Sequence, residues 1–220
     1  MRGTAPAQQD GAGHFRPKTG RPGRSKTMKH AATRALYAYW DQLRAGRAAP
    51  ERSDLDPGSI RTLLGNVFLL EFGGKDRHLV RLAGTRICTL LGREWRSRSF
   101  SEPFAAEDLP ELHALLDGVT EAAVPAVASV TGETNDGRRI DLEMLVLPLR
   151  HRGRTNTRIL GSLAAGEWPY WAGQVRIARF RLNSVRYLRQ DDAAPEEFDL
   201  VSPPQRMPLG RLRLLPGGRA

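Results

Sequence analysis

The sequence predicts an α+β domain built around one antiparallel sheet. Three observations predict it: runs with apolar residues at helical spacing, runs with the alternation or apolar character of strands, and glycine-containing turns between the strands. Along the chain these runs give two strands, a short helix, a longer helix and then three strands. Strands and helices that are segregated in this way favour an α+β rather than an alternating α/β architecture.

The first helical pattern precedes the predicted sheet. The run TMKHAATRALYAYWDQLRAG places four apolar residues on one stripe: Leu36, Tyr39, Trp40 and Leu43. A second helix is expected to begin with Asp56 as its N-cap and to end at Gly65. Residues 27–66 are therefore predicted to form an N-terminal helical extension.

The strands and the remaining helices follow. The run NVFLLEFGGKDRHLVRLAG predicts a hairpin that turns at residues 73–76, and RLAGTRICTLLG predicts a strand followed by a short helix between Gly84 and Gly92. Asp108 and Glu111 fit a capping box for the longer helix. Three strands are then expected from AVASVTGET, RRIDLEMLVLPL and TRILGSLAA, and the run near residue 180 fits a further strand.

The positive charge is concentrated at the two ends of the chain. The formal net charge is +10, of which residues 1–34 carry +7 and residues 202–220 carry +4, so the part between is close to neutral. Residues 1–26 are predicted to be a disordered basic tail, and residues 190–220 a loose C-terminal tail. Nucleic acid or an anionic surface could bind through these tails, but a basic folded surface is not expected, so this function is not favoured.

Composition excludes several other classes of protein. The single cysteine excludes an internal disulfide framework, and the five histidines show no metal-ligand spacing. The basic N-terminus has no apolar stretch of the kind found in secretory signals, and no apolar run approaches the roughly 20 residues of a membrane span. A cytoplasmic protein without a bound metal is therefore expected.

The order of motifs across residues 67–165 resembles the PAS domain, a family of sensory and interaction modules. The run RLAGTRICTLLGREWRSRSFSEPFAAEDLPELHALL supplies the family's motif residues in order: Gly84, Leu90, Leu91, Gly92, Phe100, Glu107 and Asp108. The chain departs from the family at Ala105–Ala106, where a proline is commonest. The preceding run YWDQLRAGRAAPERSDLDPGSIRTLLGNVFLLE is similar to the lead-in of a bacterial single-domain PAS branch formerly classed as a domain of unknown function.

This resemblance implies a five-stranded antiparallel sheet with helices on one face, and often a small-molecule pocket between them. It also implies signalling by ligand binding and dimer contacts rather than by catalysis. Facing apolar positions of the predicted helices and the long strand give a candidate pocket wall: Ile87, Leu91, Leu112, Leu116, Leu142 and Met144. A non-enzymatic regulatory protein that binds a small molecule, a partner protein or both is therefore expected.

Cofactor and catalytic chemistry has little support in the residues. A phosphate-binding loop would need a Lys–Ser/Thr pair where Arg93–Glu94 stands, and the helix around Cys88 lacks the polar sequence of a light-sensing flavin PAS domain, so flavin is not expected. A haem held by His113 of the longer helix is an alternative with no supporting motif around it. Asp141 and Glu143 share a strand face beside two arginines, which indicates a solvated, charge-paired surface rather than a catalytic pair.

Two sets of apolar residues are candidate interaction surfaces. The stripe Leu36, Tyr39, Trp40 and Leu43 could pack on the sheet or form the seam of a homodimer. In residues 166–189, an aromatic and basic extension, Trp168 and Trp171 could pack over the sheet or anchor a partner protein. The sequence leaves both pairs of alternatives open.

Overall fold

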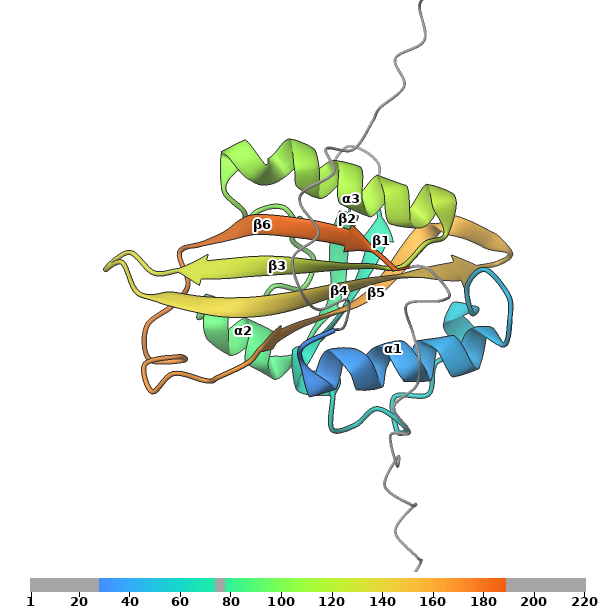
Figure 1. Cartoon of the computed structure of the whole chain (residues 1–220), viewed down its shortest axis with the longest axis horizontal. Coiled ribbons are helices and arrows are strands. Elements are labelled where there is room, and N and C mark those ends of the chain that lie inside the picture. Colours follow the sequence, from blue (N-terminus) through green and yellow to red (C-terminus); the bar gives the residue numbers. More distant parts are fainter. Residues whose placement is uncertain (1–27, 74–77, 189–220) are drawn as a thin grey trace, which may run out of the picture.

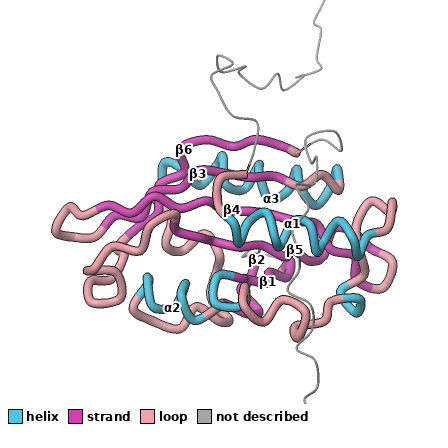
Figure 2. Tube along the Cα trace, turned by 60° about the horizontal axis from the view of Figure 1, so that its bottom comes forward, coloured by secondary structure: helices cyan, strands magenta, loops and turns pink. Residues whose placement is uncertain are grey.

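A single antiparallel sheet of six strands organises the chain, with helices on both of its faces (Figure 1). The computed structural model describes residues 28–73 and 78–188. The strand order is β2-β1-β5-β4-β3-β6, so the long strand β4 lies inside the sheet. Helix α3 covers one face and helix α1 covers the other, which Figure 2 shows from a second direction.

The helices and strands have the following bounds in chain order: α1 Ala31–Arg44, β1 Val67–Phe72, β2 His78–Ala83, α2 Thr85–Leu91, α3 Leu109–Ala122, β3 Ala126–Glu133, β4 Arg139–His151, β5 Arg154–Ala165 and β6 Arg179–Tyr187. Short 3-10 turns occupy Arg52–Asp54, Leu64–Asn66 and Ala106–Asp108. The predicted α+β class is confirmed. The predicted tails, residues 1–26 and 190–220, lie outside the described residues, as does most of the β1–β2 turn.

The sheet has six strands rather than the expected five. Strand β6 pairs antiparallel with β3 from Ala126 opposite Tyr187 to Glu133 opposite Arg179. It lies along the edge of β3 that faces away from β4. Its successive side chains point to opposite faces of the sheet. Phe180 is fully buried on the α3 side, whereas Arg179 beside it is exposed. The expectation of a PAS-type sheet with five strands is therefore wrong in its strand count.

Both faces of the sheet are apolar, because β4 buries alternate residues on each side. On the α3 side it contributes four residues to one cluster: Ile140, Leu142, Met144 and Val146. On the α1 side it contributes three to a second cluster: Leu145, Leu147 and Leu149. Each cluster needs its own cover, and a helix on a single face would leave the other exposed. The expected placement of helices on one face is therefore incomplete.

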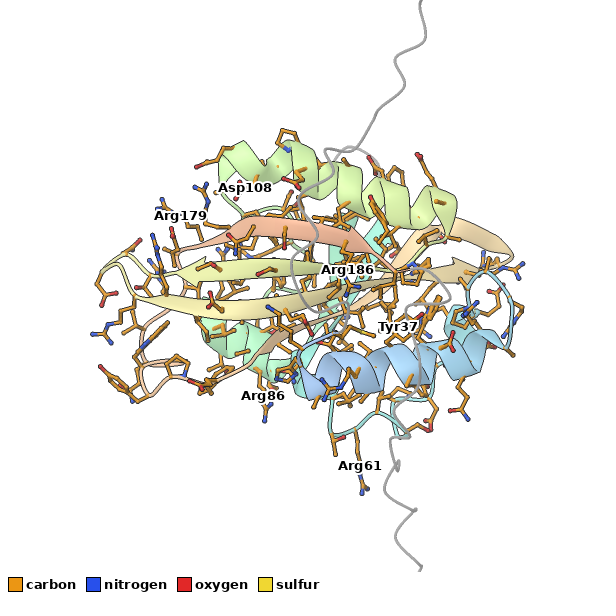
Figure 3. The ribbon with its side chains drawn as sticks, viewed as in Figure 1. Tyr37, Arg61, Arg86, Asp108, Arg179 and Arg186 are labelled. Atoms are coloured by element: carbon orange, nitrogen blue, oxygen red, sulfur yellow. The ribbon has the colours of Figure 1, made fainter. Side chains whose placement is uncertain are left out.

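Helix α1 covers the second apolar face with the stripe predicted from its spacing. Leu36, Tyr39 and Trp40 are buried against the sheet, and Leu43 is partly buried. Of the two alternatives for this stripe, the structure shows packing on the sheet. Tyr37, on the same helix, is also buried and lies on the side that faces the sheet (Figure 3).

Trp40 anchors α1 by a buried hydrogen bond as well as by the apolar surface that its ring buries against the sheet. Its indole Nε1 donates to the carbonyl oxygen of Pro148 in β4 at 2.8 Å. The β3–β4 pairing ends at Ala126 and Val146, so Pro148 lies past the last β3 partner of β4. A proline, which lacks an N–H, is tolerated at such a position. The tryptophan thus satisfies a carbonyl at the point where the neighbouring strand ends.

The joint between β2 and α2 depends on two glycines for different reasons. A Cβ on Gly84 would lie 2.1 Å from the Leu64 carbonyl oxygen, so only glycine lets the backbone approach that turn. Gly84 is also the N-cap residue of α2, which begins at Thr85. Gly92 closes the helix with φ 62°, a left-handed conformation that favours glycine.

Two predicted capping features form differently in the structure. No α-helix follows Asp56, because residues 59–61 bond their N–H groups to carbonyls three residues back and the Asp56 carboxylate takes the N–H groups of Gly58 and Ser59. Asp108 is the N-cap residue of α3 but makes no capping bond. Its carboxylate instead accepts the backbone N–H of Leu182 in β6, at 3.0 Å.

Trp40→Ala should lower the free energy of unfolding by roughly 3–5 kcal/mol, the usual cost of truncating a buried tryptophan. Besides the lost apolar burial, the substitution leaves the buried Pro148 carbonyl oxygen without its hydrogen-bond donor, which adds to the loss of stability. Urea unfolding of the full chain measures it. Gln42→Ala, at an exposed position of the same helix, is the matched control and should stay within about 0.5 kcal/mol of the original chain. A loss below about 1 kcal/mol for Trp40→Ala would contradict the anchoring role.

Candidate functional site

The six residues of the predicted pocket wall come together on the α3 side of the sheet. All are at most 3% exposed and belong to one cluster: Ile87, Leu91, Leu112, Leu116, Leu142 and Met144. Large aromatic rings fill much of the same layer in a chain of contacts with centroids 4.8–5.6 Å apart: Phe68, Trp95, Phe100, Phe104 and Phe180. The binding of a ligand by these residues stays a prediction.

The two residues weighed for cofactor chemistry lie at the borders of this layer. His113 is half-buried on α3 beside the fully buried Leu112. Cys88 is half-buried on α2, with its thiol Sγ 3.8 Å from the Ala83 carbonyl oxygen. Burial raises the pKa of this thiol, and the nearby Glu94 carboxylate adds to the rise. Since the thiolate is the reactive form, Cys88 has the character of an unreactive thiol.

The α1 face of the sheet is polar beyond the N-terminal end of α1. Strand registers place the side chains in rows across β4, β3 and β6. Arg139, Glu133 and Arg179 form the outermost row, and Glu133 makes ion pairs with both arginines at 3.2 and 2.8 Å. The next row holds Asp141, whose carboxylate accepts a hydrogen bond from Thr131 Oγ1 at 3.3 Å.

These rows form the floor of a groove, which we call the sheet groove. It consists of two hollows of about 490 and 890 Å³ that share Arg139 and Asp141. The strands β3, β4 and β6 line it from below. Two further segments form its walls: Lys29–His30 before α1, and the loop after β5 with Gly166, Glu167 and Pro169. The groove is therefore a concave, polar surface built from segments far apart in the sequence.

Glu143 of β4 fixes the chain where it enters α1. Its carboxylate accepts the backbone N–H groups of Lys29 and His30 at 2.8 and 2.9 Å. The His30 Nδ1 then caps the helix by accepting the N–H of Ala32 at 3.0 Å. A guanidinium nitrogen of Arg34 donates to the carbonyls of Met28 and Lys29. The wall of the groove next to α1 is thus held by hydrogen bonds from both the sheet and the helix.

The edge strand β6 is tied to the start of α3 by acidic residues. Arg181 makes ion pairs with Glu107 and with Asp108, the latter at 3.2 Å. The pKa of the Glu107 carboxyl is lowered, chiefly by a backbone hydrogen bond and then by Arg181. Figure 3 shows Asp108 and Arg179 near one another at this end of the molecule. Glu107 and Asp108, which belong to the motif that resembles the PAS family, therefore hold strand β6 against the start of α3.

Exposed aromatic residues lie in the loop that forms one wall of the sheet groove. Trp168 is 44% exposed and Tyr170 83% exposed, whereas Trp171 is buried in the α3-side cluster. The Trp171 carbonyl accepts the N–H groups of Gln174 and Val175, both at 3.0 Å. The loop is therefore anchored by Trp171 and presents the other two rings to solvent.

Sequence reasoning did not find the role of Glu143 or the groove itself. Arg138 and Arg139 were expected to neutralise Asp141 and Glu143, but they pair with Asp136 and Glu133 instead. Glu143 contacts residues more than 110 positions away, and no local pattern indicates such a bond. The alternation of β4 did indicate that Asp141 and Glu143 share a face.

Within residues 28–73 and 78–188, no group of three or more potential metal ligands lies close together. In the same part of the chain, no helix combines the length and the apolar character that a bilayer crossing requires.

Comparison with known proteins identifies the family. A model of the PAS domain family matches residues 28–164, well over half of the sequence, and the chain belongs to this family. PAS domains are generally sensory, non-catalytic modules. The family match begins at α1, which agrees with the position of this helix on the sheet.

No curated protein matches the chain in sequence. Solved structures similar to it include the PAS domain of a Colwellia psychrerythraea protein, which is 12% identical with a TM-score of 0.40, covering 50% of this chain and 97% of that one. A Rhodobacter sphaeroides LOV protein is 11% identical with a TM-score of 0.40, covering 54% and 73%. A PAS domain of an HTR-like protein from Haloarcula marismortui is 19% identical with a TM-score of 0.34, covering 49% and 89%. Likenesses at this level carry no argument about ligands or partners.

Arg179→Gln should raise the pKa of Glu133 toward the ordinary glutamate range. The pKa of this carboxyl is lowered first by its hydrogen bond with Arg179 and further by the charges of Arg179 and Arg139. Because the lowered pKa belongs to the folded state, the ion pair stabilises the fold above the ordinary glutamate pKa and this contribution is lost as pH falls through the lowered pKa. A carbon-detected NMR titration of Glu133 measures the shift. Arg61→Gln, at an exposed position outside this row, is the control, and an unchanged Glu133 pKa in Arg179→Gln would contradict the assignment.

Proposed function

We propose that this chain is a non-catalytic regulatory PAS module that acts by binding a partner protein on the α1 face of its sheet. The observation that carries the proposal is a formed concave surface, the sheet groove, next to two exposed aromatic residues of the loop that supplies Gly166, Glu167 and Pro169 to its wall. Trp168 and Tyr170 offer large apolar contact area there. Tryptophan and tyrosine with polar surroundings are the residues that most often dominate the energy of protein interfaces.

The interior of the domain supports a protein partner over a small ligand. In the layer between the sheet and α3, the space is occupied by closely spaced aromatic rings, with Phe100 in contact with three others. Protein interiors are packed about as densely as organic crystals, so a ligand would have to displace such rings. The groove on the opposite face needs no such rearrangement, because its hollows are open.

The geometry of the loop also favours recognition at this surface. Trp171 is buried, and the loop backbone is held by hydrogen bonds from Gln174 and Val175 to its carbonyl. A loop fixed in this way presents Trp168 and Tyr170 with little conformational entropy left to lose on binding. Contacts of this kind need no reacting group, in keeping with a regulatory rather than a catalytic module.

Site-specific photocross-linking tests the proposal. Replacing Trp168 or Tyr170 with photoreactive benzoylphenylalanine in the native cells should give a discrete cross-linked product that contains a second, different protein. The same replacement at Ala114, an exposed position on α3 at the opposite face, is the matched control and should give none. Mass spectrometry identifies the product.

Two outcomes of this experiment would contradict the proposal. One is the absence of any product from both loop positions, or the same set of products from Ala114 as from the loop. The other is a product that consists of linked copies of this chain alone, since that would place a homodimer contact rather than a partner protein at the groove.

A further inference from the structure

Strand β6 lies at the edge of the sheet, and the first half of its outer edge is already bonded. An edge strand presents a row of N–H and C=O groups to which another strand can bond. Phe180 donates its N–H to the Pro103 carbonyl at 2.7 Å and accepts the N–H of Ala105 at 2.9 Å. The Asp108 carboxylate accepts the N–H of Leu182 at 3.0 Å. Any open part of this edge therefore lies beyond Leu182.

Two residues in the second half of β6 present an open edge. Leu188 donates its N–H toward β3, to the Pro125 carbonyl at 2.8 Å. Successive residues of a strand alternate between its two edges, so the N–H and C=O groups of Tyr187 and Val185 point away from β3. The register shift beside Ser129 moves this alternation by one residue relative to Leu182. Among the residues that the structure describes, none bonds these two N–H groups or these two carbonyls.

The chain leaves the sheet at the end of this same open edge. Leu188 is 4% exposed, so the 32 residues that follow it begin at the sheet. A segment that turns back after β6 runs antiparallel along the open edge, as the second strand of a hairpin does. Because it is covalently attached, its effective concentration at the edge is in the millimolar range, which favours contacts too weak to form between separate molecules.

The two faces of β6 decide which side chains fit beside the open edge. Val185 and Tyr187 lie on the α3 side, where Val185 packs against the apolar cluster and the Tyr187 hydroxyl lies over Gly118. Tyr187 is still 44% exposed. Arg186, between them, faces the α1 side of the sheet, where its partner on β3 is Val127 (Figure 3). A matching strand therefore carries an acidic residue between two apolar ones.

Residues 189–220 contain one triplet with this pattern, Phe198–Asp199–Leu200. We propose that this triplet adds to the open edge of β6 as an antiparallel strand, in the register that places Asp199 opposite Arg186. In this register the N–H and C=O groups of Phe198 and Leu200 meet those of the two outward-facing residues of β6. Residues 189–197 form the connection, and the sheet of the full chain gains a seventh strand.

A second copy of the chain fits the same edge less well. Antiparallel pairing that joins Val185 of each copy to Tyr187 of the other places the two Arg186 side chains opposite one another. Like charges in that position are destabilising. The docking of the chain's own triplet goes beyond the proposed regulatory function and does not depend on it, because it needs no partner protein at the sheet groove.

Hydrogen exchange of single amides in the full chain, followed by NMR, tests the docking. The measured amides are those of Val185 and Tyr187. The test variant is Leu200→Pro, which removes a ladder N–H from the proposed strand and disfavours its extended pairing. The matched control is Ala193→Pro, which makes the same replacement in the connection. The Arg186 amide, which points to β3, reports whether the sheet is intact.

In the original chain and in Ala193→Pro, both measured amides should exchange about tenfold or more slowly than in Leu200→Pro, because the added strand bonds them. The Arg186 amide should exchange alike in all three proteins. Equal exchange of the measured amides in the original chain and in Leu200→Pro would overturn the proposal, since the triplet would then not cover the edge. Protection that grows with protein concentration would also overturn it, since a second copy would then supply the strand.

Discussion

The structure depends on a sheet whose central strand is apolar on both faces. In β4, Met144 and Val146 are buried on the α3 side, while Leu145 and Leu147 are buried on the α1 side, and all four are fully excluded from solvent. Burial of apolar side chains is the main favourable contribution to folding, so neither face can be left open to water. Helix α1 is therefore part of the folded core rather than an appendage to it. The buried hydrogen bond from Trp40 to Pro148 fixes where it lies.

The same strand decides where the candidate site forms. Along the α1 face, β4 changes from Asp141 and Glu143 to Leu145, and α1 begins where that change occurs. Glu143 marks the boundary, because its carboxylate holds the backbone that leads into the helix. The apolar half of the face is covered by α1, and the polar half is left as the floor of the sheet groove. Fold stability and a concave polar surface thus follow from one change of pattern within a single strand.

Much of the fold could be predicted from the sequence, and the parts that could not have physical causes. Local periodicity predicted α1, α3 and the order of strands, and the Gly84–Gly92 joint carried the family resemblance. The sixth strand was harder to predict because only pairing with the edge of β3 gives its alternating residues two distinct environments. The groove could not be predicted, since it joins segments around residues 30, 141 and 167 through long-range contacts such as that of Glu143. Capping patterns were misleading at Asp108, whose carboxylate bonds a distant strand instead of its own helix.

Hydrogen–deuterium exchange of the full chain, read by mass spectrometry, tests most directly whether α1 is part of the core. If it is, the amides of residues 31–44 should open with the same free energy as those of the central strand β4, because both are then exposed only by global unfolding. A mild denaturant should accelerate both segments in parallel. Exchange of α1 that is orders of magnitude faster than that of β4, with the sheet still protected, would contradict the account and would make α1 a detachable helix.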